Sequence, residues 1–439
     1  MTRLNVTPLT VKSPMHRARR IGARDVAAVL LLVLPLLLGS GAAVAQTFRI
    51  LYSFGAEVGD GTFPWGIRFD ANGNLIGMAT LEGNPFEEAG AIFRLAPPAQ
   101  PGGLWTHTVL YRFHGAPDGD TPECVPALTA NGRIFGTTYL GGANNVGTVF
   151  IAQPPAVPGD PWVERRIYSF GNFAGDGINP NAGVRLRGGK VFGVTSGGGA
   201  TGEGTIYVLD PPVAPGAGWT ETILHDFGAG EDVSFPLGEL AIDEDGNIYG
   251  NAILGGTDNF GGVYRVSPPA QPGGDWTGTV LHSFDGSDGS SPAGPLLIAA
   301  DGALYGTTGG GGPRQGGTVF KLTPPADPTA PWTYSLVFAF SGGRDGGSPE
   351  GGVKMDAAGR LWGTTNVGGN GGPNFGGVLF ILHPPAVPGD PWTETVLHSF
   401  GGPDGFRPIA PLMFRDGAVY GATTQGGDFG TGTVFEFRF

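Results

Sequence analysis

Seven aspartates, each four residues before a proline, recur at regular intervals along the chain and are the residues best placed to do chemistry. The pairs are Asp60/Pro64, Asp118/Pro122, Asp176/Pro180, Asp232/Pro236, Asp288/Pro292, Asp345/Pro349 and Asp404/Pro408. A ring of carboxylates could bind Ca²⁺, or a cationic or hydroxyl-rich ligand. Alternatively, each aspartate opens a turn by bonding its own backbone, and glycine follows it in six of the seven cases. Equal use in every repeat favours the turn, since a single ligand site usually breaks the symmetry, so we expect no cofactor and keep Ca²⁺ as the alternative.

A second set of residues alternates between histidine and tyrosine at one repeat position. The set is His225, His282, His398, Tyr52, Tyr111 and Tyr168. Interchange with tyrosine predicts an aromatic-sized filler on an outer strand rather than a metal ligand or a base. No Ser/His/Asp order, Cys–His pair, zinc spacing or nucleotide-binding loop rises above chance in the sequence. We therefore assign no catalytic residue, and we expect the single cysteine, Cys124, to be a small buried hydrophobe.

Polar residues that the repeat does not share are found on glycine-rich loops. They are Glu87, Glu88, Asn144, Asn145, Arg314, Gln315, Asn370 and Asn374. A specific binding site is most readily built on loops where a repeat departs from its own pattern. These residues are our ligand-loop candidates.

The elements that position these residues follow from a long period in the sequence. Six tryptophans recur roughly every 57 residues, at positions 105, 162, 219, 276, 332 and 392. Each unit holds four strand-like runs, which in the fifth unit are Pro292–Ala300, Ala303–Thr308, Gly317–Thr323 and Thr333–Phe340. A two-residue turn with glycine in second place joins the first two runs, as expected for an antiparallel hairpin. Four antiparallel strands repeated around an axis predict an all-β fold, a β-propeller of four-stranded blades.

The count of strands predicts seven blades and the way in which the ring closes. The first three strands occur seven times, whereas the fourth follows a tryptophan only six times. Thr47–Phe54 matches the fourth-strand phrase and has no unit before it. We therefore expect this segment to join the last blade beside Gly432–Arg438, which would leave no open edge. We also expect the tryptophans to pack over the apolar base of each blade, and the second-strand glycines to be buried.

Three short motifs in fixed order resemble the bacterial tandem repeat called GloVer. They are Tyr305-Gly306-Thr307-Thr308, Gly316–Leu322 and Val280–Phe284, and the likeness extends over the whole chain after residue 45. Proteins with this repeat include exported "choice-of-anchor" proteins, so the resemblance implies an exported propeller. Many of them carry a C-terminal sorting segment, but this chain ends in Phe435–Phe439 without a hydrophobic tail. The family implies no established reaction.

The first 45 residues resemble a secretory signal. Four arginines between positions 17 and 24 precede the apolar run Val26–Leu38, and small residues follow up to Ala45. We expect cleavage before Gln46, which would leave residues 46–439 as the propeller with no membrane association. The alternative is an uncleaved anchor over Val26–Ala45. Residues 1–45 hold six of the 25 basic residues and one of the 38 acidic ones, so residues 46–439 carry a net charge of −18. Such a surface repels nucleic acid.

The sequence favours a binding or scaffold role over an enzyme. We expect an exported, periplasmic, cell-surface or extracellular propeller that acts as a monomer and recognises a glycan or a protein. The alternative is a lyase or hydrolase that acts on a polysaccharide through carboxylates near the central channel. The first interpretation is favoured because no acid pair outside the repeat is evident in the sequence, and fold alone does not decide function.

Overall fold

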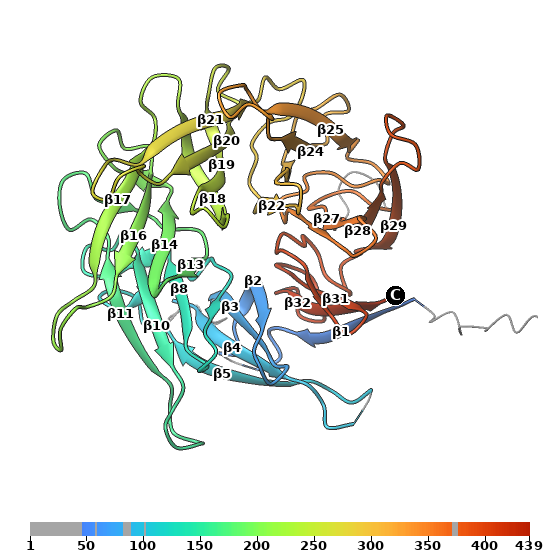
Figure 1. Cartoon of the computed structure of the whole chain (residues 1–439). Coiled ribbons are helices and arrows are strands. Elements are labelled where there is room, and N and C mark those ends of the chain that lie inside the picture. The colour runs from blue at the N-terminus through green and yellow to red at the C-terminus, as the bar shows by residue number, and fades with distance from the viewer. Residues whose placement is uncertain (1–45, 58, 82–88, 101, 371–375) are drawn as a thin grey trace, which may run out of the picture. The chain divides into compact units, whose positions relative to one another are not determined.

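The chain folds as a seven-bladed β-propeller, which confirms the predicted fold class (Figure 1). The computed structural model describes residues 46–57, 59–81, 89–100, 102–370 and 376–439. These residues contain no α-helix, and therefore no helix that could cross a membrane. The expected signal segment, residues 1–45, lies outside the described residues.

Each blade is an antiparallel sheet of four strands that runs from an innermost to an outermost strand. Blades 1 and 2 contain β2 (Thr62–Phe69), β3 (Leu75–Leu81), β4 (Ala91–Ala96) and β5 (Thr106–Arg112), then β7 (Ala127–Leu128), β8 (Ile134–Thr138), β10 (Thr148–Gln153) and β11 (Val163–Ser169). Blades 3 and 4 contain β13 (Arg185–Arg187), β14 (Lys190–Thr195), β16 (Thr205–Asp210) and β17 (Thr220–Asp226), then β18 (Val233–Ile242), β19 (Ile248–Gly255), β20 (Gly262–Ser267) and β21 (Thr277–Ser283).

The remaining blades follow the same order, and the last one takes its outermost strand from the start of the described chain. Blades 5 and 6 contain β22 (Leu297–Ile298), β23 (Leu304–Thr308), β24 (Thr318–Thr323) and β25 (Thr333–Ala339), then β26 (Val353–Met355), β27 (Leu361–Thr364), β28 (Val378–His383) and β29 (Thr393–Ser399). Blade 7 contains β30 (Met413–Arg415), β31 (Ala418–Thr423), β32 (Thr433–Arg438) and β1 (Thr47–Ser53). The predicted closure is thereby confirmed, and Figure 1 shows β1 beside β32.

Two faces of the ring differ in the loops that they carry. The upper face holds the aspartate loops between blades together with the glycine-rich turns between second and third strands. Short pairs join these loops there, such as β6 (Gly119–Asp120) with β9 (Leu140–Gly141) and β12 (Gly177–Ile178) with β15 (Gly197–Gly198). The lower face holds the hairpins between first and second strands and the proline-rich loops that end in tryptophan.

The innermost strand of blade 5 is shorter than the sequence pattern predicted, whereas β2 and β18 of blades 1 and 4 pair through their prolines, Pro64 and Pro236. In blade 5 the run Pro292–Ala300 forms ladder pairs only over Leu297–Ile298. This run contains two prolines, Pro292 and Pro295, which have no backbone N–H to donate to a ladder. The inner edge of the blade is consequently an irregular segment whose side chains line the channel.

The hydrophobic core is divided into clusters, each formed where two neighbouring blades meet. Every tryptophan of the repeat packs, partly buried, against one of these clusters, as expected for a structural role. The cluster between blades 6 and 7 has no such tryptophan, and Phe439 packs there with its ring centroid 4.5 Å from that of Trp362. Cys124 is buried between blades 1 and 2, and this burial raises the pKa of its thiol to about 11.

The second-strand glycines are buried, as the sequence predicted, and each lies against an aromatic ring of the neighbouring strand. They are Gly136, Gly193, Gly250, Gly306, Gly363 and Gly421. Each leaves room for the aromatic ring of its partner on the third strand, as Gly306 does for Phe320. An ideal Cβ at Gly306 would also lie 2.8 Å from Leu296 Cδ2, so the space is already filled.

Candidate functional site

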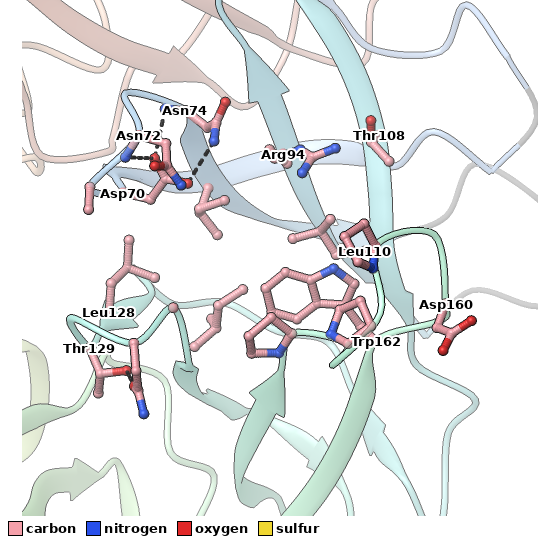
Figure 2. Close-up of a pocket in the computed structure, with 18 of the residues that line it drawn as sticks. Asp70, Asn72, Asn74, Arg94, Thr108, Leu110, Leu128, Thr129, Asp160 and Trp162 are labelled. Atoms are coloured by element: carbon pink, nitrogen blue, oxygen red, sulfur yellow. Dashed lines mark hydrogen bonds between the residues drawn. The ribbon is translucent and has the colours of Figure 1, made fainter.

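A groove of about 970 Å³ on the lower face separates blades 1 and 2, and Trp162 is among the side chains that line it (Figure 2). The Asp70 carboxylate in this groove accepts hydrogen bonds from the backbone N–H groups of Asn72 and Asn74, at 2.9 and 2.8 Å, and from Asn74 Nδ2 at 2.7 Å. A comparable groove of about 870 Å³ between blades 7 and 1 contains Trp105. The groove is therefore a feature of the repeat. The Asp70 carboxylate within it is occupied by hydrogen bonds to its own turn.

The seven aspartates of the repeat lie on the upper face, where their carboxylates hold the turns together. Six of them accept a hydrogen bond from a backbone N–H three to five residues earlier: Asp60, Asp118, Asp176, Asp288, Asp345 and Asp404. Asp232 instead accepts one from Val233 N at 2.8 Å. Within the described ranges, no three His, Cys, Asp or Glu side chains come close enough together to hold a metal ion. The ring of aspartates thus has the hydrogen bonds that turn formation requires.

The histidine and tyrosine position has a role that the sequence interpretation missed. Its ring bonds the aspartate of the following loop in six blades: Tyr52 with Asp60, Tyr111 with Asp118, Tyr168 with Asp176, His225 with Asp232, His282 with Asp288, and His398 with Asp404, at 2.6 to 3.1 Å. Phe338 stands at this position on β25, where Asp345 pairs with Arg314 at 3.1 Å instead. Tyrosine and histidine interchange because both place a polar hydrogen at the ring edge.

Three of these aspartates also interact with a glutamate of the next outer strand. The pairs are Asp118 with Glu164, Asp176 with Glu221, and Asp345 with Glu394. Burial, reinforced by the charge of the aspartate, raises the pKa of Glu164 to about 7 and those of Glu221 and Glu394 to about 8. Asp176 Oδ1 and Glu221 Oε1 are buried and accept no hydrogen bond. A carboxyl proton on Glu221 would satisfy this arrangement near neutral pH.

We expect the thermal stability of the propeller to fall as pH rises from about 5 to about 8. The ordinary glutamate pKa is 4.5, whereas partial burial raises the pKa of Glu164 to about 7 and the pKa values of Glu221 and Glu394 to about 8 in the folded chain. The folded state therefore binds more protons in this window than the unfolded state does, so their contribution is full below the window and is lost as pH rises through it. Melting temperatures by calorimetry at pH 5, 6, 7 and 8 measure the slope.

The double variant Glu221→Gln with Glu394→Gln should flatten this profile, because an amide keeps a donor toward the aspartate and does not titrate. Glu231→Gln, at an exposed position, is the matched control. An equal slope in the double variant would contradict the explanation. If Ca²⁺ bridges these pairs instead, millimolar Ca²⁺ will raise the melting temperature at pH 8 by mass action. With the turn role alone, added Ca²⁺ leaves it unchanged.

The ligand-loop candidates that the structure describes are bonded within the upper-face turns. Asn144 Nδ2 donates to Phe170 O at 3.0 Å, and Asn145 Oδ1 accepts from Gly141 N at 3.1 Å. Gln315 Nε2 donates to Gly312 O at 3.0 Å, while Arg314 bonds Asp345, and the backbone N–H of Asn370 lies 3.4 Å from Ser399 Oγ. These residues belong to blades 2, 5 and 6 and hold separate turns. Glu87, Glu88 and Asn374 lie outside the described residues.

The central channel contains a polar group of residues that the sequence interpretation did not single out. One ring of side chains is the residue that directly follows the proline of each unit: Trp65, Glu123, Asn181, Leu237, Ala293, Glu350 and Ile409. All seven line a cavity of about 300 Å³ at the upper mouth of the channel, and Glu239 lines it as well. Leu237, Ala293 and Ile409 are aliphatic at this position, whereas the other four units carry an aromatic, acidic or amide side chain. The position therefore departs from the repeat in those four units.

The polar side chains of this upper-mouth pocket are only partly satisfied by the protein. Burial raises the pKa of Glu123, and Asn181 Oδ1 is buried without a hydrogen-bond partner. Glu350 accepts longer hydrogen bonds, from Ser348 Oγ at 3.2 Å and from Asn366 Nδ2 at 3.3 Å. An aromatic ring, two carboxyl groups and a free amide oxygen in a concave site can recognise hydroxyl groups.

Glu239 is the most deeply buried acid of the channel, with its side chain 6% exposed. Arg68 Nη2 lies 2.9 Å from its Oε1 and Arg185 Nη2 lies 3.1 Å from its Oε2. Arg68 belongs to blade 1 and Glu239 to blade 4, which are not neighbours, so this ion pair crosses the channel. The carboxylate is neutralised by groups that only the closed ring brings together.

A family match supports the resemblance that the motifs indicated. Residues 158–369 match the model of the Gloeobacter/Verrucomicrobia repeat. This stretch consists of that repeat. It covers the outermost strand of blade 2, blades 3 to 5 and the first two strands of blade 6, so the GloVer resemblance is confirmed over these residues. No curated protein compared with the chain matches it.

Solved structures resemble the chain at low sequence identity. The extracellular domain of BT4673 from B. thetaiotaomicron has a TM-score of 0.51 and 14% identity, over 90% of this chain and 42% of that one. PorZ, a surface component of the type-IX secretion system of Porphyromonas gingivalis, has a TM-score of 0.49 and 15% identity, over 85% and 46%. A Xanthomonas campestris gluconolactonase has a TM-score of 0.40 and 14% identity, over 90% and 89%. The chain spans less than half the length of the first two proteins, and the BT4673 likeness supports the fold alone.

Proposed function

We propose that the chain is an exported binding propeller that takes a glycan at the upper mouth of its central channel. The observation that carries the proposal is the upper-mouth pocket, where Trp65, Glu123, Asn181 and Glu350 interrupt the repeat. Sugar rings stack on aromatic faces, and their hydroxyl groups bond carboxylate and amide oxygens. A volume of about 300 Å³ suits one or two sugar units at a chain end.

Export is the second part of the proposal, and the signal-like residues 1–45 support it together with the GloVer resemblance. In this proposal the chain is cleaved before Gln46 and acts as a monomer in the periplasm, on the cell surface or outside the cell. Proteins with this repeat include exported choice-of-anchor proteins, and the acidic charge of residues 46–439 disfavours nucleic acid as a partner. The intact mass of the secreted protein shows whether it begins at Gln46.

The test is a panel of neutral oligosaccharides, scored by calorimetry for binding and by chromatography for cleavage. We expect Trp65→Ala to weaken binding about tenfold, because aromatic contacts contribute about 0.5–1.5 kcal/mol beyond the area that they bury. Phe173→Ala is the control, since Phe173 is 54% exposed on an upper-face loop and does not line the pocket. If no oligosaccharide binds, or if both variants bind equally well, the proposal is wrong.

A polysaccharide lyase or hydrolase is the second candidate function, and one observation favours it. Burial raises the pKa of Glu123, as is typical of a carboxyl group that donates a proton in catalysis. Glu350 on the same pocket would be the second carboxylate that glycoside hydrolysis requires. Cleavage products in the panel that disappear in Glu123→Gln, with binding retained, would establish the enzyme.

A further inference from the structure

One position of the innermost strand is basic in three blades and apolar in the other four. It is the position that pairs with the residue before the second-strand glycine, and its occupants are Arg68, Ala127, Arg185, Ala241, Leu297, Lys354 and Met413. The chain as a whole has a net charge of −13, so three cations at one position of the inner strands run against its composition.

These three cations converge from blades 1, 3 and 6 on a single carboxylate. Arg68 and Arg185 both bond Glu239, as described above. The Lys354 ammonium interacts electrostatically with Glu239 and with both arginines. Arg185 and Lys354 also line the same hollow, so the three cations and Glu239 form one cluster inside the channel.

The cluster carries more positive than negative charge. Glu239 balances one of the three cations, and the Lys354 ammonium makes no hydrogen bond or ion pair with a side chain of the described residues. Arg68 Nε is also buried without a partner. Burial lowers the pKa of Lys354, which is the expected response of a cation whose counterion is incomplete. Two positive charges are thus left for a group that the protein itself does not supply.

The cluster is accessible from the lower face through a hollow of about 570 Å³ that Arg185 and Lys354 line. Arg187 lines it too, and its guanidinium bonds the backbone carbonyls of Asp243 and Glu244. The Asp243 carboxylate accepts hydrogen bonds from its own turn, from Asn247 and Tyr249. Two acids, Asp243 and Glu244, line the hollow. Because the Asp243 carboxylate already accepts hydrogen bonds from the protein, Glu244 is the other acid beside the cations.

We propose that this basic cluster is a binding site for an oxyanion group, held by Lys354 together with Arg68 and Arg185. The group is a carboxylate, phosphate or sulfate, either free or carried by an acidic sugar. Arginine and lysine bind such groups with charge-assisted hydrogen bonds, which are stronger than neutral ones. The site opens to the lower face and shares only Glu239 with the lining of the upper-mouth pocket, so it goes beyond the proposed function.

The experiment is calorimetric titration of the full protein with inorganic phosphate, inorganic sulfate and trigalacturonate at low ionic strength. We expect Lys354→Met to weaken the best of these ligands at least tenfold, since the variant removes a charge-assisted hydrogen bond to the oxyanion. Blade 7 carries Met413 at the equivalent position, so the fold already accommodates methionine there. Lys190→Met is the control, because Lys190 pairs with Asp210 at 2.8 Å on an outward-facing turn.

A second variant tests the same charge balance in the opposite direction. Glu239→Gln removes the one neutralising carboxylate, so it should tighten anion binding, and its melting curve shows whether the fold is intact. Binding of phosphate or sulfate would identify a free ion as the source, and binding of trigalacturonate alone would identify a sugar acid. Three silent titrations, or equal losses in Lys354→Met and Lys190→Met, would overturn the inference. Trp65→Ala should leave anion binding unchanged, which separates this site from the upper-mouth pocket.

Discussion

A chain that lacks residues 46–54 should lose most of its stability and aggregate. These residues form β1, which pairs with β32 from Thr47 opposite Arg438 to Ser53 opposite Thr433. Leu51 and Phe54 are buried in the cluster between blades 7 and 1, and two such side chains contribute about 3–6 kcal/mol. The deletion would also expose the edge of β32, which is a template for pairing between chains.

The charge of Glu436 adds to this loss. Its side chain is 3% exposed and lies 2.9 Å from Arg49 on β1. Arg438 and the Tyr420 hydroxyl would be its remaining partners after deletion. Removal of one partner from a buried charge is destabilising, since the other charge loses compensation. Glu436 therefore couples the closing strand to blade 7 by charge as well as by the ladder.

The matched pair for this test is a chain that begins at Gln46 and one that begins at Gly55. Thermal melting with light scattering compares them at equal concentration. We expect the shorter chain to melt at a much lower temperature or to scatter light before it unfolds. Coincident melting curves and equal solubility would show that β1 does not close the ring.

The sequence predicted the fold well because the repeat supplies each strand many times over. The glycine turns mark the hairpins, the prolines mark the loops, and the unmatched segment Thr47–Phe54 indicates the closure. The inner strand of blade 5 was predicted too long, since the run Pro292–Ala300 contains two prolines and pairs only over Leu297–Ile298. The turn role of the aspartates followed from the same repetition, and the structure supplies the hydrogen bonds that it requires.

The channel residues could not be recognised in the same way, because each of them occurs once. Arg68 and Glu239 are separated by 171 residues and meet only when blades 1 and 4 face each other across the closed ring. A signal was present, because two positions of the inner strand can be aligned between the seven units. One is the residue that follows the proline, and the other is the residue that pairs with the one before the second-strand glycine. Glu123, Glu350 and Lys354 depart from these columns. A search for departures within inner strands, rather than within loops, would have found them.

Gly306→Val should destabilise the propeller by about 1–3 kcal/mol, because the side chain has no space to occupy. Gly306 lies on β23 opposite Phe320, whose ring is fully buried over the glycine. The new Cβ would lie 2.9 Å from Phe320 Cε1 and 2.8 Å from Leu296 Cδ2, both closer than real Cβ contacts allow. The ring cannot move away easily, since it also packs against Phe284 with centroids 5.3 Å apart.

Gly218→Val is the control for this prediction, because an ideal Cβ at Gly218 meets no atom within 4 Å and its backbone is exposed. Denaturant unfolding of the two variants measures the difference in their free energies of unfolding, provided that the dependence on denaturant concentration has the same slope in both. Equal stabilities of the two variants would mean that the Phe320 ring does not need the space that Gly306 leaves. The same contact recurs at Gly363, whose Cβ would lie 3.1 Å from Phe380 Cε1, so a loss at Gly306 implies a comparable one there. In the six second strands where the glycine follows an aromatic residue, the third-strand ring occupies the space that a side chain at the glycine would need.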